Sequence, residues 1–555
     1  MSRTKKLLIY TLFFAAAAAY FTYLQGSKTF ADPDSFYHAK ITEMMSQGQI
    51  IIKDFSWIKF AAFSQNFTDH HFLYHVFLAP FVMIFGALWG TKIASIILAT
   101  AVLGFFYFFL KRWRIRWPLF YTLLLLVAPT FIFRINLAKA GPLSIIILLI
   151  ALSLIWQKRY RALGLLSFLY VWTYGGWSLI IILACTDLVA QAIIAVSSRK
   201  NLSQIPNSQF PIPKQFLFSR FYFLIYKVNW KPLGAVLLGC AAGLIINPYF
   251  PANLQFYWQQ LVQIGMINYQ DIVSVGQEWY PYPTLDFLAN GAFIFILGIA
   301  ALSSFFWKLQ RTVILRPQAE ESRSFALLPP KAGGQDDIKN FQKIFTLVIF
   351  AGIMGVLTLK SQRFIEYFAP FATLAGAWLL NFSLPKSFNP LDFFSKNNPK
   401  RLFNFFIALY LLLSLLLIFG LKTIELRRLL TYRFNWNYLS RSSQWLKKNT
   451  PPQSLVYHTN WSDWPMLFYH NDRNTYLIGL DPTFFYLYNP TLYREWVQIN
   501  QGEIKEGLAE KIKNNFGAEW ALIKQSDQKL LEAVSRDNRF VPQFADEEAQ
   551  IFKIQ

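Results

Sequence analysis

The sequence predicts a mainly α-helical membrane protein with many spans and a small α/β domain at its C-terminal end. Hydrophobic residues make up 54% of the 555 residues, and charged residues only 15%. Soluble globular chains rarely show this balance. Apolar runs long enough to cross a bilayer recur along the chain. From about residue 434 the composition becomes mixed, as in a soluble domain.

The first apolar run, 7–24, follows the basic start MSRTKK. It is long enough to cross a bilayer at about 1.5 Å per residue. Because no small-residue cleavage site follows it cleanly, we expect an uncleaved membrane anchor and not a signal peptide.

The net charge of +23 could indicate a nucleic-acid partner, but its distribution favours the positive-inside rule of membrane proteins. Basic residues cluster at 3–6, 111–116, 158–161, 199–231, 308–339 and 386–401. If these clusters are cytoplasmic, about eleven spans result. We place them at 7–24, 91–110, 118–134, 142–156, 161–177, 178–196, 232–247, 288–307, 341–359, 365–381 and 402–421.

This arrangement puts the N-terminus in the cytoplasm and the C-terminal domain outside an inner membrane. The transmembrane domain is then 1–433, with external loops at 25–90 and 248–287 and a cytoplasmic linker at 308–340. The loop 248–287 contains no Lys or Arg, as expected of an external segment. Residues 69–88 are largely apolar, but counting them as a span would put 111–116 outside. We therefore expect 69–88 to be an external helix lying on the membrane.

The predicted C-terminal domain, 434–555, alternates strand-like and helical segments. The strand-like runs are 454–458, 475–480 and 520–524, and the helical ones are 441–449 and 505–517. Gly517 is the expected C-cap of the last helical run. Alternation of this kind predicts an α/β domain.

Acids and histidines gather in the first external loop. Asp32 and Asp34 directly follow the first span, where a carboxylate pair can bind a hard cation or act as a general base. Asp residues at this place can equally begin a helix. In 69-DHHFLYH-75, His71 and His75 have helical i, i+4 spacing, which fits a transition-metal site, a proton relay or an interfacial helix.

Further candidates lie in later segments that the topology places outside. Glu278 is one of few acids in the second external loop. Arg363 lies at the outer edge of a span and is either an interfacial anchor or a phosphate clamp. Trp461 and Asp463 follow a predicted strand, where they could bind a sugar or peptide or form a buried turn. The aromatic run 171–177 could line a lipid or sugar path, but an interfacial belt is the favoured interpretation.

In this order the segments resemble the catalytic subunits of oligosaccharyltransferases, within the broader GT-C membrane glycosyltransferases. Asp34 with 36-FYHAK-40 is similar to the first-loop motif of that family, and 274-SVGQE-278 to its late-loop motif ending in Glu. Arg363 in 363-RFIEYFAP-370 resembles the family's Arg that holds the donor pyrophosphate. The stretch 460-NWSDWP-465 stands where the family has its acceptor-reading WWDYG motif.

Two departures accompany the resemblance. The loop 134-RINLAKAGPL-143 keeps Arg134 but has Lys139 and no acids where the family has its second acidic motif. The match to WWDYG is loose. As one hypothesis, Asp69 with His70 or His71 replaces the missing acids and joins Asp34 and Glu278 around a divalent metal, Mg²⁺ or Mn²⁺, or acts as the general base. The other hypothesis is a metal-independent site in which Lys139 supplies the positive charge.

The resemblance implies transfer of a sugar or oligosaccharide from a polyprenyl-phosphate or polyprenyl-pyrophosphate donor to a protein or glycan acceptor at the external face. Asp34, Asp69 and Glu278 would be catalytic. Arg363, Arg134, Lys139, Trp461 and Asp463 would bind substrate. Two other functions stay open, namely a transporter or flippase of lipid-linked saccharide and a non-catalytic scaffold of the envelope. Transporters usually carry charges inside the membrane, whereas the candidate charges here gather at one face.

Overall fold

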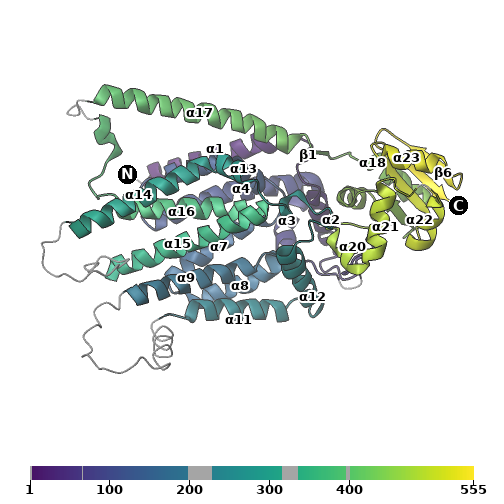
Figure 1. The fold of residues 1–555 in the computed structure, drawn as a ribbon, viewed down its shortest axis with the longest axis horizontal. Helices are drawn as coiled ribbons and strands as arrows, with labels where there is room; N and C mark the ends of the chain where they lie inside the picture. The colour runs from purple at the N-terminus through teal and green to yellow at the C-terminus, as the bar shows by residue number, and fades with distance from the viewer. Residues whose placement is uncertain (1–2, 65–66, 198–227, 315–334, 395–399, 505) are drawn as a thin grey trace.

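The computed structural model describes residues 3–64, 67–197, 228–314, 335–394, 400–504 and 506–555. The molecule is elongated, with a bundle of helices at one end and a C-terminal α/β unit at the other (Figure 1). The N-terminus lies at the end of the bundle far from this unit.

Each of the eleven predicted spans corresponds to one helix or to one broken pair of helices. The helices are α1 (Arg3–Gln25), α4 (Ala87–Arg112), α5 (Pro118–Leu126), α6 (Pro129–Ile135), α7 (Gly141–Trp156), α8 (Tyr160–Thr173), α9 (Ser178–Ser197), α11 (Lys231–Ile245), α13 (Thr284–Asn290), α14 (Ala292–Ile314), α15 (Gln335–Lys360), α16 (Ile365–Ser383) and α17 (Arg401–Thr431).

Two predicted spans are broken. The axes of α5 and α6 differ by 85°, and those of α13 and α14 by 77°. Pro129 begins α6, and a proline disfavours helical geometry at the residue before it. Gly291 separates α13 from α14. The first break turns the chain just before Arg134.

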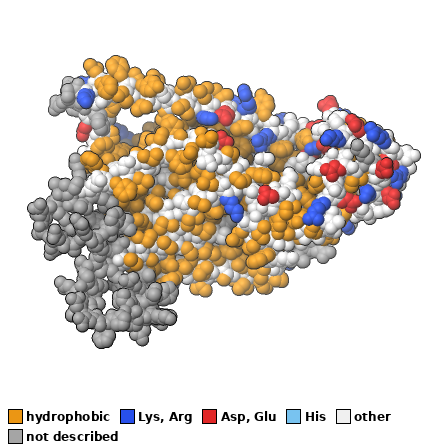
Figure 2. Space-filling model, viewed as in Figure 1, with side chains coloured by type: hydrophobic (Ala, Val, Ile, Leu, Met, Phe, Trp, Pro, Cys, Tyr) orange, Lys and Arg blue, Asp and Glu red, His pale blue; other side chains and the backbone are white. Residues whose placement is uncertain are grey.

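Five of the described helices are long and apolar enough to cross a membrane, or seven if each broken pair counts as one span. Hydrophobic side chains cover the surface of the bundle, and charged ones concentrate on the C-terminal unit (Figure 2). The chain is thus a membrane protein, and the count of about eleven spans stays a prediction. Most of the predicted linker 308–340 lies outside the described residues.

The two segments predicted as external loops fold mainly into short helices. The first contains β1 (Thr29–Phe30), α2 (Asp34–Ser46) and α3 (Phe72–Phe85). The second contains α12 (Ala252–Trp258), the π-helix η2 (Gln259–Ile267) and the 3₁₀ helix η3 (Gln277–Trp279). Two further 3₁₀ helices are η4 (Gln362–Phe364) and η5 (Pro390–Phe394). The expected helix within 69–88 is therefore present as α3, and its position on a membrane stays a prediction.

The C-terminal unit holds a five-stranded sheet in the order β4-β3-β5-β7-β6. Strand β3 runs parallel to β4 and β5, whereas β5, β7 and β6 are antiparallel. Its elements are β2 (Phe434–Asn435), α18 (Ser440–Asn449), β3 (Leu455–His458), η6 (Trp461–Asp463), α19 (Trp464–His470), β4 (Thr475–Tyr476), α20 (Thr483–Tyr488), α21 (Pro490–Asn500), α22 (Leu508–Phe516), β5 (Trp520–Lys524), α23 (Gln528–Ser535), β6 (Phe540–Ala545) and β7 (Ala549–Ile554).

The first external loop is hydrogen-bonded to this unit. Tyr476 exchanges backbone hydrogen bonds with the 57–59 segment: its N–H donates to the Trp57 carbonyl over 3.0 Å, and its carbonyl accepts from Lys59 over 2.8 Å. Strand β1 pairs with β2 across the boundary predicted at 433/434. One hydrophobic core runs through both parts. The loop that carries Asp32 and Asp34 is thereby held between bundle and C-terminal unit.

Candidate active site

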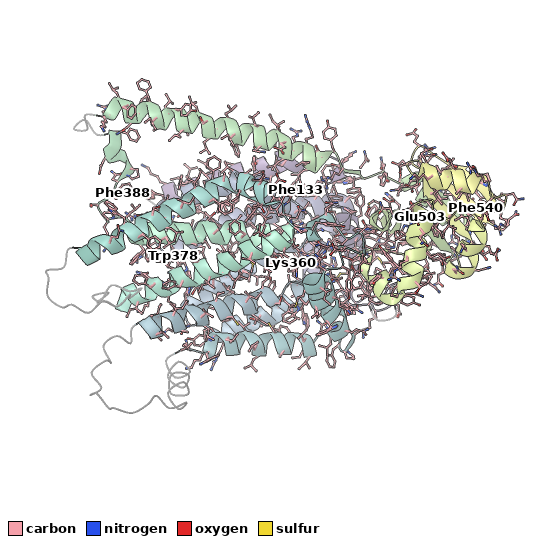
Figure 3. The ribbon with its side chains drawn as sticks, viewed as in Figure 1. Phe133, Lys360, Trp378, Phe388, Glu503 and Phe540 are labelled. Atoms are coloured by element: carbon pink, nitrogen blue, oxygen red, sulfur yellow. The ribbon has the colours of Figure 1, made fainter. Side chains whose placement is uncertain are left out.

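Five candidate residues from distant parts of the sequence meet at the end of the bundle that faces the C-terminal unit. Asp34 begins α2, Arg134 lies in α6, Glu278 in η3 and Arg363 in η4, and Lys139 lies between α6 and α7. Lys360, at the end of α15, marks this end of the bundle, whereas Trp378 lies toward the other end (Figure 3). The structure therefore brings these five sequence-predicted residues together.

The Lys139 ammonium lies among three carboxylates. Its Nζ is 2.9 Å from Asp32 Oδ2, 2.8 Å from Asp34 Oδ2 and 3.4 Å from Glu278 Oε2. Burial alone would lower the pKa of Lys139, but the three carboxylates together raise this pKa well above its ordinary value. Lys139 thus remains a cation and holds the three acids together.

Glu278 is surrounded by cations. Its Oε2 accepts a hydrogen bond from Arg134 Nη1 over 2.6 Å, and its Oε1 is 3.6 Å from Arg363 Nη1. Burial would raise the pKa of Glu278, but Lys139, Arg134 and Arg363 lower it well below its ordinary value. Glu278 is therefore a fixed negative charge and a poor proton acceptor.

Asp32 and Asp34 differ in exposure. The Asp34 side chain is 32% exposed, against 18% for Asp32 and 20% for Glu278. Burial raises the pKa of Asp32 to about 6, with Lys139 opposing the shift. Asp34 is therefore the most exposed of the three carboxylates.

The Arg363 guanidinium is held in place by aromatic residues. Its Nη2 donates to the Tyr174 hydroxyl over 2.7 Å, and its plane lies 4.4 Å from the centre of the Trp279 ring. Among the described residues, Tyr174 is its only hydrogen-bond partner, so further N–H donors of the guanidinium are available to an anion. Tyr174 belongs to the run 171–177, for which the sequence favoured an interfacial belt, but its hydroxyl contacts Arg363 in the charged cluster.

The histidines of the first loop form a second, buried group beside the charged one. Asp69 Oδ2 is 2.7 Å from His75 Nδ1, and His75 Nε2 is 2.8 Å from His38 Nδ1. The other Asp69 oxygen accepts the His71 backbone N–H over 3.0 Å. Burial lowers the pKa of His70 to about 4 and that of His71 well below its ordinary value. These imidazoles are therefore neutral.

The arrangement does not fit the divalent metal site of the first hypothesis. Both Asp69 oxygens bind the histidine segment, and the Lys139 ammonium lies between Asp34 and Glu278. Among the described residues, no group of three or more His, Cys, Asp or Glu is arranged to hold a metal ion. Asp69, His70 and His71 thus do not join Asp34 and Glu278, and we derive no step through a metal.

Trp461 and Asp463 lie in the C-terminal unit. The Trp461 indole N–H donates to the Ser274 carbonyl over 3.0 Å, so this residue packs on the segment that leads to Glu278. Asp463 is buried and pairs with Lys524 over 3.0 Å. Trp461 therefore borders the site, whereas Asp463 is bound within its own unit.

One acid of the site, Glu366, was not assigned a role from the sequence. Glu366 is buried, accepts a hydrogen bond from Arg134 Nε over 3.3 Å, and keeps its Oε1 without a partner among the described residues. Its position three residues after Arg363, at the start of a helix, was the available signal.

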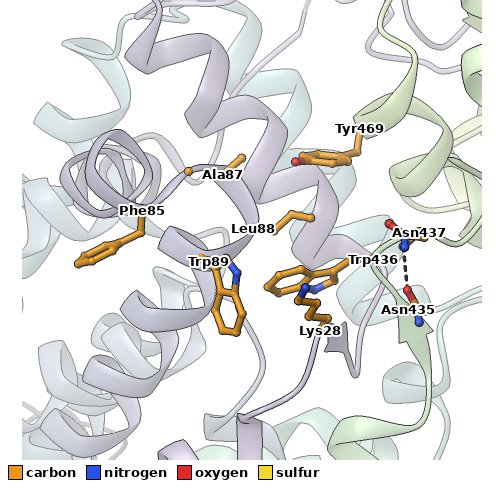
Figure 4. A pocket seen from close by; sticks show the side chains of 10 residues that line it. Lys28, Phe85, Ala87, Leu88, Trp89, Asn435, Trp436, Asn437 and Tyr469 are labelled. Carbon is orange, nitrogen blue, oxygen red and sulfur yellow. Dashed lines mark hydrogen bonds between the residues drawn. The ribbon is translucent and has the colours of Figure 1, made fainter.

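A cavity of about 400 Å³ is lined by residues at the start of α4 and around β2 (Figure 4). Trp89 and Trp436 pack edge to face there with ring centroids 4.8 Å apart, and Lys28 and Asn437 also line the cavity. Trp436 also packs with Phe30, Phe36 and Ala138 in one cluster. None of the residues that line the cavity belongs to the charged cluster, so the cavity is distinct from the charged site.

The sequence matches no family model and no curated protein. Solved structures do match its fold. The apo oligosaccharyltransferase of Archaeoglobus fulgidus aligns with TM-score 0.58 and 13% identity over 98% of this chain and 74% of that one. The same enzyme tethered to an acceptor peptide with an NVT sequon gives 0.52 and 12% over the same shares.

ArnT from Cupriavidus metallidurans bound to undecaprenyl phosphate aligns with TM-score 0.51 and 14% identity, over 99% of this chain and 98% of that one. These similarities extend over nearly the whole chain, including the C-terminal unit. The chain therefore has the fold of the GT-C membrane glycosyltransferases.

Proposed function

We propose that the protein is a membrane glycosyltransferase that moves a sugar or oligosaccharide from a polyprenyl-phosphate or polyprenyl-pyrophosphate donor to a protein or glycan acceptor. The observation that carries this proposal is the cluster of Lys139, Arg134 and Arg363 with three carboxylates. It lies at one end of an apolar bundle, where the head group of a membrane lipid can reach it. Of the similar structures, one holds undecaprenyl phosphate and another an acceptor peptide.

In this proposal, the cations stabilise the leaving phosphate. In the reaction, the bond between the anomeric carbon and the phosphate oxygen breaks, and the lipid phosphate leaves with the electron pair. Arg363 has N–H donors to offer this phosphate, and Trp279 and Tyr174 hold its guanidinium in position. A prepositioned guanidinium stabilises charge that develops in the transition state.

The carboxylates position the acceptor and the phosphate-binding cations. Asp34 is the most exposed of the three and has one oxygen held by Lys139. Its other oxygen can accept a hydrogen bond from the acceptor nucleophile and align it with the anomeric carbon. Glu278 keeps Arg134, Arg363 and Lys139 at fixed places, which preorganises the phosphate-binding cations.

Lys139 supplies, in this proposal, the positive charge that the resemblance assigns to a divalent metal. Its ammonium binds all three carboxylates and so offsets their mutual repulsion. The proposed reaction therefore proceeds in the presence of a chelator.

The proposed location is the extracytoplasmic face of the inner membrane. Described basic residues such as Lys111 and Arg112 end α4 at the far end of the bundle, where the positive-inside rule places the cytoplasm. A transporter or an envelope scaffold would not require donors and acceptors gathered in this way at one end. Turnover of a donor would distinguish a transferase from a transporter or a scaffold.

The test uses full-length protein in lipid nanodiscs with a panel of sugars linked to undecaprenyl phosphate and undecaprenyl pyrophosphate. Release of the lipid phosphate is followed with and without EDTA. We expect turnover that EDTA does not reduce and that Asp34→Ala reduces by 100-fold or more, because alignment of the nucleophile is lost. No turnover together with no binding of undecaprenyl phosphate would refute the transferase. Loss of turnover with EDTA would refute the role given to Lys139.

A further inference from the structure

We infer that Asp69, His75 and His38 form a hydrogen-bonded array that keeps Nε2 of His38 unprotonated, and that this nitrogen takes the proton of the acceptor nucleophile. The inference rests on the proposed function and adds the general base that the charged cluster does not provide.

The three side chains of the array are buried and joined in series. Asp69 Oδ2 and His75 Nδ1 are 2.7 Å apart, and His75 Nε2 and His38 Nδ1 are 2.8 Å apart. His75 is fully buried, and His38 and Asp69 are nearly so. Three buried polar side chains joined in series are stable only when every hydrogen-bond donor has an acceptor.

The direction of the hydrogen bonds follows from Asp69. Its Oδ1 accepts the His71 backbone N–H, so the carboxyl orientation is fixed. As a carboxylate, Asp69 can only accept, so His75 Nδ1 carries the hydrogen and His75 Nε2 is bare. His38 Nδ1 must then donate to His75 Nε2, which leaves the lone pair of His38 on Nε2.

The bare nitrogen belongs to a residue beside the charged cluster. His38 lies four residues after Asp34 on α2, so both side chains are on the same helix face. Its ring contacts His71 at a centroid distance of 5.0 Å, and the His71 ring lies 5.8 Å from that of Tyr174, the partner of Arg363. Within the described part of the chain, His38 Nε2 has no hydrogen-bond partner.

Two carboxylates of the cluster, Glu278 and Asp34, are already engaged by cations. Glu278 faces three cations, and one Asp34 oxygen is tied to Lys139. His38 starts as a neutral imidazole, because burial, His75 and Lys139 hold its pKa well below the ordinary value. When it takes a proton, the negative charge of Asp69 at the far end of the array offsets the new positive charge. This is how a carboxylate orients and supports a catalytic histidine.

The acceptor O–H or N–H gives its proton to His38 Nε2 while the acceptor atom forms the bond to the anomeric carbon. The lipid phosphate leaves with the electrons of the broken bond. The imidazolium is stabilised through His75 by Asp69 and later releases its proton to water or to the departing phosphate. His38 is thus a catalytic residue, and His75 and Asp69 are positioning residues.

The first test reads the tautomer and needs no substrate. The chain has only six histidines, so ¹⁵N-histidine labelling with solid-state NMR in lipid is practicable, with His38→Gln identifying the His38 signals. We expect a neutral His38 with protonated Nδ1 and bare Nε2. A His38 protonated at Nε2 in the wild-type protein would overturn the inference.

The second test uses Asp69→Asn. Because Oδ1 is held by the His71 N–H, the amide NH₂ of Asn must face His75 Nδ1, which reverses every hydrogen bond and puts a hydrogen on His38 Nε2. We expect kcat for lipid phosphate release to fall by at least about 100-fold with KM for the donor unchanged, the scale of a lost general base. Asp187→Asn is the matched control. Asp187 is a buried carboxylate of α9 bonded to Gln342 and Thr346, away from the cluster, and its variant should keep full kcat.

The outcomes separate this inference from the proposed function. If the wild-type protein turns over donor and Asp69→Asn does so at the same rate, the base is not His38 but the transferase stands. If the wild-type protein turns over no donor, the proposed function fails and with it the catalytic role of His38. An equal loss of kcat in Asp69→Asn and Asp187→Asn would mean that the array has a structural role and no catalytic one.

Discussion

Lys139 sets the charge balance of the candidate active site, because its ammonium reaches all three carboxylates. Of these three carboxylates, Arg134 and Arg363 contact only Glu278. Removing the Lys139 charge would leave Asp32 and Asp34 close together with no cation between them. Like charges at this distance repel strongly when buried.

The variant Lys139→Met tests this role, because it keeps the length of the side chain and removes its charge. We expect release of lipid phosphate to fall by about 100-fold or more, the effect of losing one preorganised electrostatic contact. Lys360→Met is the control, since Lys360 lies at the same end of the bundle but is exposed and bonded to the Met266 carbonyl. Full activity of Lys139→Met would show that its ammonium takes no part in the reaction.

Asp32 gives the stability of the protein a defined pH dependence. Burial raises its pKa from 3.8 to about 6 in the folded protein. Between about pH 4 and 6 the folded state therefore binds more protons at Asp32 than the unfolded state does. The contribution of Asp32 to the free energy of unfolding thus falls as the pH rises through this window.

Asp32→Asn removes this dependence while keeping an oxygen for the Asp34 backbone N–H. Relative to wild type, we expect the variant to gain stability between pH 4 and 6, by at most about 3 kcal/mol, and to show a constant difference above pH 7. Thermal unfolding in detergent at several pH values measures the difference. A difference that shrinks as the pH rises would mean that pairing with Lys139 outweighs burial.

Among the elements, the long apolar helices followed from the sequence because one strong signal, hydrophobic length, specifies them. Strands β3 and β5 followed from their apolar runs, and Gly517 adopts the left-handed C-cap conformation expected of it, with φ of 74°. The expected strand 475–480 shrinks to β4, because the 57–59 segment takes part of the pairing at this edge. Strands β6 and β7 were not expected, since Pro542 and the acidic turn after it mask the alternation.

The crossing of α8 and α11 depends on two glycines, a feature that helix length does not reveal. A Cβ on Gly239 would lie 2.1 Å from the Gly164 carbonyl oxygen, so the two backbones touch. Small residues permit such close approach between helices in membranes.

Gly239→Ala should lower the free energy of unfolding by about 1–3 kcal/mol, because the helices must separate to admit the methyl group. Gly234→Ala on the same helix is the matched control. A Cβ there meets nothing within 4 Å, so this variant should be neutral or slightly stabilising. Equal melting temperatures of the two variants in nanodiscs would contradict the close crossing.

At the scale of the whole molecule, the site exists only because four distant segments meet at the end of the bundle that faces the C-terminal unit. Motif order identified Asp34, Glu278 and Arg363, but sequence could not tell which cation or acid faces which. Asp69 illustrates the limit. Its spacing fitted a metal site, and the fold instead turned it toward His75 and His38. Contacts across 37 residues or more depend on the packing of α2 on α3, which no local pattern encodes.

The proposed donor and acceptor require the charged site to face the extracytoplasmic side of the membrane. We therefore predict that the C-terminal unit lies outside the cell and the basic end of the bundle inside. The test starts from a chain whose two native cysteines, Cys185 and Cys240, are replaced by alanine. Gln543→Cys adds an exposed thiol on the C-terminal unit, and Lys158→Cys adds one between α7 and α8 at the basic end of the bundle. A membrane-impermeant maleimide added to intact bacterial spheroplasts should label the first thiol and not the second.

Permeabilised cells, in which both thiols should react, provide the control for accessibility. Labelling of Lys158→Cys alone would place the charged site in the cytoplasm and would exclude the proposed extracytoplasmic transfer, whatever activity the purified protein shows.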